Sequence, residues 1–186
     1  MKIINERSEI IDKSVENFDS MTEKFTLTYY YISPQDSERI EQFKSCSGDS
    51  EKILVTQYVR GWLGRNRDYY LDLARMDAEA RGIPFREWGE TVVNKGVEAL
   101  PGYKKEIGDI PPNPLRDIAL SPDVIRKGIN YIALGKQNLA LLKVGVLYDR
   151  DNAIGFISRI IKEHLTRNWE KLYLPQVEAE NFENWK

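Results

Sequence analysis

The chain has 186 residues, of which 41% are hydrophobic and 30% are charged. This composition is typical of a globular protein and excludes a disordered or collagen-like chain. The formal net charge of −2 excludes a strongly basic domain that would bind nucleic acid on charge alone, so any site for a polyanion must be local.

Three features of the sequence predict a cytoplasmic protein. Cys46 is the only cysteine, so no internal disulfide can form, which suits a reducing compartment. The first residues contain no apolar stretch long enough for a signal peptide. No run of about eighteen apolar residues occurs, so we expect neither a membrane-spanning helix nor a membrane partner.

The first part of the chain carries signals for a helix, a strand and a second helix. Residues 2–20 place apolar side chains at near-helical spacing and predict an amphipathic helix. Residues 26–32 are β-branched and aromatic and predict the best strand of the chain. Ser33-Pro34-Gln35-Asp36 then predicts a helix start, because serine can cap, proline fits the first helical position and aspartate complements the helix dipole. This helix should run to about Phe43.

Residues 51–81 allow three interpretations. Their apolar residues follow a 3.6-residue period, which one long helix would explain. Gly61 and Gly64 each cost a helix about 1 kcal/mol relative to alanine, and Asn66 could cap a new helix, so a break within 61–66 is an alternative. Residues 53–59 could instead form a strand, since this apolar run is short and β-branched.

The middle of the chain is predicted to contain a helix, an irregular segment and a further helix. Residues 84–100 have one apolar helical face, which ends at Pro101-Gly102. Prolines make residues 101–120 irregular, and we expect an extended strap on the surface. Ser121-Pro122-Asp123 repeats the earlier start signal and predicts a helix from Val124. The apolar residues of that helix are Ile125, Ile129, Ile132, Leu139 and Leu142.

The C-terminal part is predicted to be helical up to its tail. Residues 141–148 can be the end of the preceding helix or a short strand. Asp151 or Asn152 should cap the last helix. This helix has the cleanest apolar stripe of the chain, formed by Ile154, Ile157, Ile160, Ile161, His164, Leu165, Trp169 and Leu172. The acidic tail, residues 175–186, should be loosely held.

Together these elements predict a mainly α fold, a compact helical domain of about six helices with one short strand or hairpin. Residues 1–100 form an N-terminal helical part whose candidate binding helices lie within 51–100. The strap 101–120 connects it to a C-terminal helical part, residues 121–174, which we expect to pack on the first as one domain.

The sequence offers little for catalysis. His164 is the only histidine, so a histidine-rich zinc site is excluded, and its place on an apolar stripe predicts a core residue with a hydrogen bond. No nucleophile elbow, phosphate loop or dinucleotide-binding fingerprint occurs. Asp149 and Asp151 are best interpreted as turn and capping residues, although a small metal-dependent enzyme with a carboxylate site there is an alternative. We therefore predict no catalytic residue, metal or cofactor, and favour a non-catalytic protein.

A cluster of arginines and aromatic residues gives the main functional hypothesis. Guanidinium groups beside flat rings can contact phosphates and stack on bases, and the same residue types dominate protein interfaces. The sequence thus predicts a binding or regulatory module for a protein or nucleic-acid partner. The candidate binding residues are Arg60, Trp62, Arg65, Arg67, Tyr69 and Tyr70.

Residues 57–100 also resemble one known family. The run from Arg67 to Trp88, continued by apolar residues to Leu100, is similar to the two-helix part of ribbon-helix-helix DNA-binding proteins. The resemblance implies a preceding β-ribbon within Gln57–Arg65, with alternate residues such as Arg60 and Arg65 in the major groove of DNA. It also implies a homodimer and a role as a transcriptional or plasmid-maintenance regulator.

Overall fold

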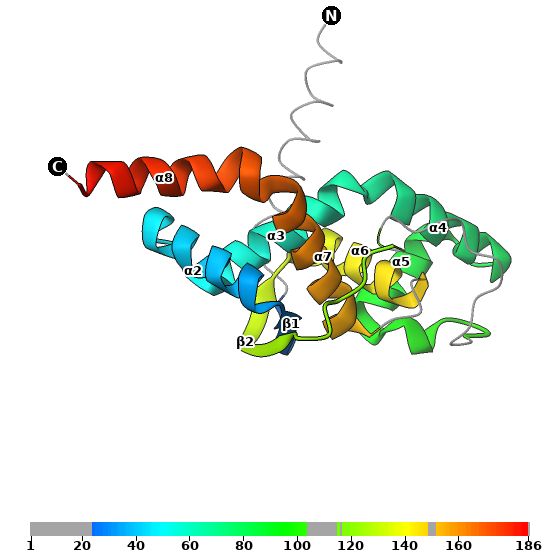
Figure 1. The fold of residues 1–186 in the computed structure, drawn as a ribbon. Coiled ribbons are helices and arrows are strands. Elements are labelled where there is room, and N and C mark those ends of the chain that lie inside the picture. The colour runs from blue at the N-terminus through cyan, green and yellow to red at the C-terminus, as the bar shows by residue number, and fades with distance from the viewer. Residues whose placement is uncertain (1–23, 104–114, 116, 149–151, 186) are drawn as a thin grey trace, which may run out of the picture.

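The computed structural model describes residues 24–103, 115, 117–148 and 152–185. The helix predicted for residues 2–20, most of the predicted strap and the two aspartates Asp149 and Asp151 lie outside the described residues. Within the described residues the fold is mainly helical with one small sheet, as predicted (Figure 1).

The sheet consists of two antiparallel strands that are far apart in the sequence. The predicted strand is confirmed as β1, Lys24–Ile32, and its partner is β2, Ile125–Ala133. The helix predicted from Val124 is therefore wrong over its first half. Its isoleucines fit helical spacing, but they are β-branched, and pairing with a distant strand decides between the two structures.

Helix α2, Pro34–Ser47, begins as the sequence predicts. The Ser33 hydroxyl accepts a hydrogen bond of 3.1 Å from the Asp36 backbone N–H. The helix is one turn longer than predicted and ends at Gly48, whose φ of 74° is the left-handed conformation that favours glycine.

The ambiguous segment 51–81 is helical with a break. Helix α3 covers Glu51–Arg65 and helix α4 covers Arg67–Ala80, so the strand alternative is wrong. Asn66 lies at the break, but its side chain donates to the Trp62 carbonyl at 3.0 Å and does not cap α4. The segment in which the ribbon-helix-helix resemblance placed a β-ribbon is thus helix α3 in this structure.

The middle of the chain forms two further helices, α5 and α6. Helix α5 covers Phe85–Lys95 and is followed by a 3-10 turn, Val97–Ala99. Helix α6 covers Gly135–Tyr148, which resolves the ambiguity of residues 141–148 in favour of a helix end.

Helix α7, Ala153–Asn168, is the predicted last amphipathic helix. The Asn152 side chain caps it by accepting a hydrogen bond of 2.7 Å from the Gly155 N–H. A π-helical turn, Trp169–Tyr173, leads from α7 into helix α8, Leu174–Glu183.

The predicted tail is helical: helix α8 begins at Leu174 and ends at Glu183. It extends from the body beside α2, as Figure 1 shows, and its Val177 is buried. The Cys46 thiol on α2 lies 3.5 Å from the Gln176 carbonyl. Beyond this contact the apolar side chains Phe182 and Trp185 are exposed.

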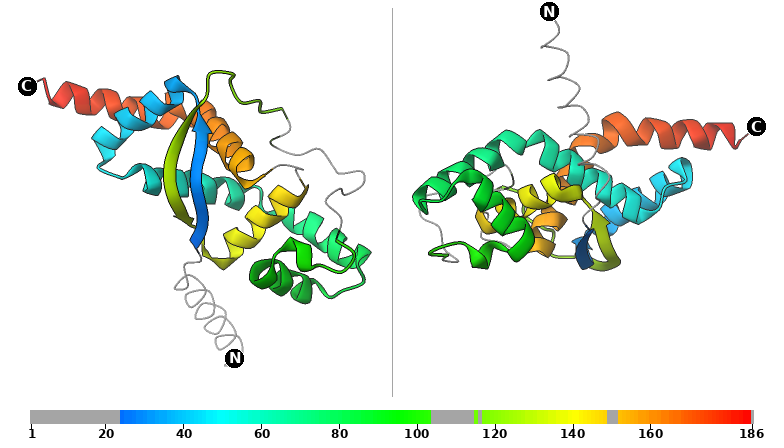
Figure 2. Two further views of the ribbon diagram at one scale, coloured as in Figure 1. Left: turned by 90° about the horizontal axis from the view of Figure 1, so that it is seen from below. Right: turned by 180° about the vertical axis from the view of Figure 1, so that it is seen from behind.

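The sheet lies on the helical body. β1 packs against α7, and the Tyr31 backbone N–H donates to the buried Ser158 hydroxyl at 2.8 Å. β2 packs against α3. In the view from below, the strands lie in front of these helices and no drawn helix covers them (Figure 2, left).

A buried polar cluster joins α4 to α5. The Asp77 carboxylate accepts hydrogen bonds from Arg81 Nε at 2.6 Å and from the Trp88 indole N–H at 2.8 Å. Arg81 also donates to the Pro101 carbonyl at 2.7 Å. Because Asp77 and Trp88 are buried, this cluster fixes the end of α4 against α5 and the turn that follows α5.

Candidate functional site

The predicted arginine and aromatic surface is divided by the fold. Trp62 and Tyr70 are 2% and 0% exposed, so the prediction that these rings face a partner is wrong. Both belong to the 3.6-residue apolar period of α3 and α4, and that period turns them toward the core. Tyr69 is half-buried, with its ring centroid 5.0 Å from that of Tyr70.

Two of the three predicted arginines point outward. Arg60 and Arg67 are exposed, and neither forms an ion pair with any residue that the structure describes. They lie seven residues apart, which is close to two helical turns.

Arg65 turns the other way, toward α7. Its Nη2 lies 4.0 Å from Glu163 Oε2, while Arg167 Nε lies 3.0 Å from Glu163 Oε1. The Glu163 side chain is only 11% exposed, whereas those of Arg65 and Arg167 are 41% and 57% exposed. The fold thus brings two half-exposed guanidinium groups from different helices to one shielded carboxylate.

An open hollow of about 460 Å³ lies beside this pair. We call it the α7 hollow; it is lined by Asp117, Ile118, Ala119, Lys162, Glu163, Thr166 and Arg167. The segment opposite α7 is held in place by two cations. Lys162 Nζ donates to the Ala119 carbonyl at 2.5 Å, and Arg159 Nη1 donates to the Leu115 carbonyl at 3.2 Å.

The charged side chains that line the α7 hollow are balanced: Lys162 and Arg167 are basic, and Asp117 and Glu163 are acidic. Arg65 reaches the same Glu163 from α3, so three basic side chains meet two carboxylates at this place. This local excess of one positive charge contrasts with the formal net charge of −2 for the chain.

The histidine behind the hollow is a core residue, as predicted. His164 is 8% exposed, its Nε2 lies 2.7 Å from the Tyr173 hydroxyl, and the Tyr58 ring stacks on it with a centroid distance of 4.2 Å. Burial lowers the pKa of His164 to about 4, and the positive charges of Arg65 and Arg167 act in the same direction. The imidazole is therefore neutral at pH 7 and adds no charge to the hollow.

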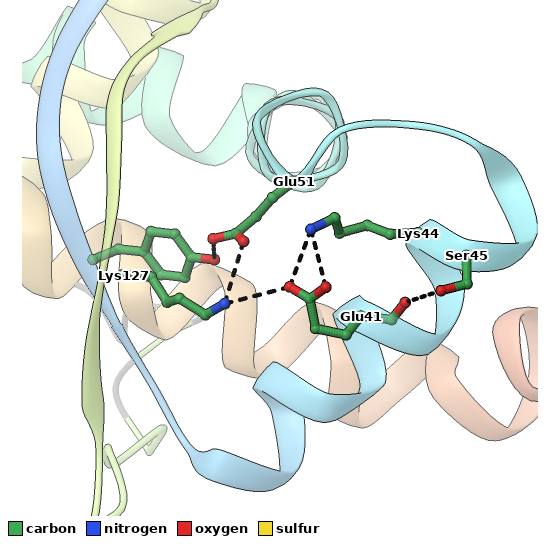
Figure 3. A network of polar contacts seen from close by, with 6 residues as sticks. Glu41, Lys44, Ser45, Glu51 and Lys127 are labelled. Carbon is green, nitrogen blue, oxygen red and sulfur yellow. Dashed lines mark hydrogen bonds and ion pairs between the residues drawn. The ribbon is translucent and has the colours of Figure 1, made fainter.

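A second polar cluster, drawn in Figure 3, is structural. Lys127 on β2 lies 3.4 Å from both Glu41 on α2 and Glu51 on α3, and the Tyr30 hydroxyl donates to Glu51 at 2.5 Å. Burial and the carboxylate of Glu51 raise the pKa of Tyr30. Since Lys44 also pairs with Glu41 at 3.0 Å, both carboxylates are neutralised, and the cluster ties the sheet to two helices.

Sequence reasoning found only part of this site. The sequence predicts Arg65 but not Lys162, Glu163 or Arg167, because the apolar stripe of α7 gives no information on its polar face. The signal that could have found two of them is the Glu163–Arg167 spacing of four residues, which favours an ion pair on a helix.

The described residues contain no group of three or more histidine, cysteine, aspartate or glutamate side chains that could hold a metal ion. None of the described helices has both the length and the apolar character needed to cross a membrane. Searches against protein-family models, curated proteins and solved structures returned no match.

Proposed function

We propose that this chain is a non-catalytic binding or regulatory module that engages a negatively charged partner through the α7 hollow. The observation that carries the proposal is the convergence of Arg65 and Arg167, both half-exposed, on the carboxylate of Glu163 at the edge of an open hollow. No contact within the described residues places the exposed Arg60 or Arg67 at this site.

The geometry leaves hydrogen-bonding capacity for a ligand. A guanidinium group has five N–H donors arranged to match a phosphate or a carboxylate. At 4.0 Å from Glu163, Arg65 is within ion-pair range but beyond hydrogen-bond distance. An anionic group entering the hollow would accept charge-assisted hydrogen bonds from Arg65. The ion pair with Arg167 would continue to neutralise the negative charge of Glu163.

A matched pair of double variants tests the proposal. Arg65→Ala with Arg167→Ala removes the two arginines of the site. Arg75→Ala with Arg86→Ala removes the same charge from α4 and α5, where both arginines are exposed and pair with neighbours on their own helix. Binding is measured on heparin and on a labelled duplex DNA as a function of salt.

We expect the site variant to lose retention on heparin and the control variant to keep it. If both arginines contact phosphates, the slope of log affinity against log salt on duplex DNA should fall by about 1.8 in the site variant. Equal behaviour of the two variants, or binding that is indifferent to salt, would remove the proposal.

A ribbon-helix-helix-like regulator is the second candidate. It is favoured by one observation, the presence of consecutive helices α4 and α5 where the resemblance implies them. Such a protein needs two chains to form its ribbon, and here the ribbon would have to come from residues other than Gln57–Arg65, which belong to α3. Light scattering coupled to chromatography distinguishes the two candidates, because a strict monomer excludes this one and leaves the α7 hollow unaffected.

A further inference from the structure

One end of the sheet carries a compact group of aromatic and basic side chains. Tyr29 and Tyr31 on β1 share one face, and the register places Gly128 and Arg126 of β2 directly opposite them. The two rings meet edge to face with centroids 5.5 Å apart, and the Arg126 guanidinium lies 4.9 Å from the Tyr29 ring centroid. We call these four residues the tyrosine platform.

The platform is accessible, and no packing contact within the described residues requires a glycine at position 128. Arg126 and Gly128 are exposed and both rings are only partly buried. A Cβ added at Gly128 would meet only the Thr28 carbonyl oxygen, at an ordinary contact distance of 3.8 Å. Glycine weakens a strand, and one that the chain's own packing does not require often marks a place where a ligand approaches closely.

The platform and the α7 hollow are connected by one side chain. Tyr31 and Lys162 line the same small recess, together with Ser121 and Val124. Lys162 also lines the α7 hollow. A single extended ligand could therefore lie on the rings of the platform and continue past Lys162 to Arg167.

We propose that the tyrosine platform and the α7 hollow together bind a single-stranded nucleic acid, an inference that rests on the proposed function. The rings of Tyr29 and Tyr31 stack on unpaired bases, and Arg126, Lys162 and Arg167 contact phosphates. Aromatic rings beside arginine in a basic groove are the usual means of holding a single strand. A duplex keeps its bases stacked on one another, and an acidic peptide offers no flat partner for the rings.

The test compares tyrosine variants on a labelled twelve-nucleotide oligothymidylate. Tyr29→Ala with Tyr31→Ala should weaken binding at least fivefold for each stacked base that is lost, while retention on heparin stays as in the original protein. Tyr29→Phe with Tyr31→Phe keeps the rings and should restore most of the affinity. Tyr131→Ala is the matched control, because this tyrosine lies on the same sheet beneath Lys52, with 4.0 Å from the ammonium to the ring centroid.

Each outcome decides between the two proposals. Tyrosine variants that bind the oligonucleotide as tightly as the original chain overturn the platform, even if the arginine variants fail to bind. The same holds if the original chain prefers duplex DNA or a polyglutamate peptide to the single strand. Absence of binding to heparin and to every oligonucleotide overturns the proposed function along with the platform.

Discussion

Replacing Asp77 by alanine should strongly destabilise the fold. The Asp77 side chain is 7% exposed and the Arg81 side chain 10% exposed, so the substitution leaves an uncompensated, shielded guanidinium group. Breaking a buried ion pair in this way costs about 3–5 kcal/mol. The Trp88 indole N–H also loses its acceptor, which adds to the loss, although the two effects share one carboxylate and do not simply add.

The expected result is a fall of about 4 kcal/mol in the free energy of unfolding, measured by urea denaturation with tryptophan fluorescence and circular dichroism. Asp72→Ala is the matched control on the same helix. Its ion pair with Arg75 has side chains 70% and 57% exposed, and we expect a change below about 0.5 kcal/mol. Equal effects of the two substitutions, or a loss below about 1 kcal/mol at Asp77, would refute the reasoning from burial.

Three further predictions concern pH, packing and capping. His164 has a folded pKa of about 4, below its ordinary value of 6.5, so the unfolded chain takes up this proton at a higher pH than the folded chain. The free energy of unfolding should therefore fall by up to about 3 kcal/mol as pH drops from 6.5 to 4. In a pH series of urea titrations, His164→Gln should flatten this part of the curve. Gly145→Ala places a Cβ against the Phe156 ring and should lower the melting temperature. Gly64 is exposed on a helix, and a Cβ added there has no atom within 4 Å. Gly64→Ala should therefore raise the free energy of unfolding by about 1 kcal/mol. Ser33→Ala removes the α2 cap and should lower the free energy of unfolding by about 1 kcal/mol in the same urea titration. An unchanged free energy of unfolding would show that the cap hydrogen bond does not stabilise α2.

Local signals in the sequence were sufficient for most of the elements. β-Branched and aromatic residues predicted β1, the Ser33 cap predicted the start of α2, and the isoleucine stripe predicted α7. These features depend on residues close together in the chain. β2 was missed because its isoleucines fit both periods, and the choice is made by pairing with a strand about 100 residues earlier, which no local pattern contains.

The site was harder to predict than the fold. The cluster of arginines and rings was visible in the sequence, but its orientation depends on how α3 and α4 turn against the core. The 3.6-residue period includes Trp62 and Tyr70 among the apolar residues, and burial of that apolar face decides their position over their suitability for binding. The partnership of Arg65 with Arg167 joins two helices that meet only in the folded chain, so no spacing could reveal it.

The most direct test of the α7 hollow observes its guanidinium groups during ligand addition. In nitrogen-15 NMR spectra, the Nε–Hε signals of Arg65 and Arg167, assigned from the single alanine variants, are followed as a short oligonucleotide is titrated into the protein. We expect these two signals to shift with saturation while those of Arg75 and Arg86 stay in place. Uniform small shifts of all four, or shifts confined to Arg75 and Arg86, would contradict the assignment of the binding surface to α7.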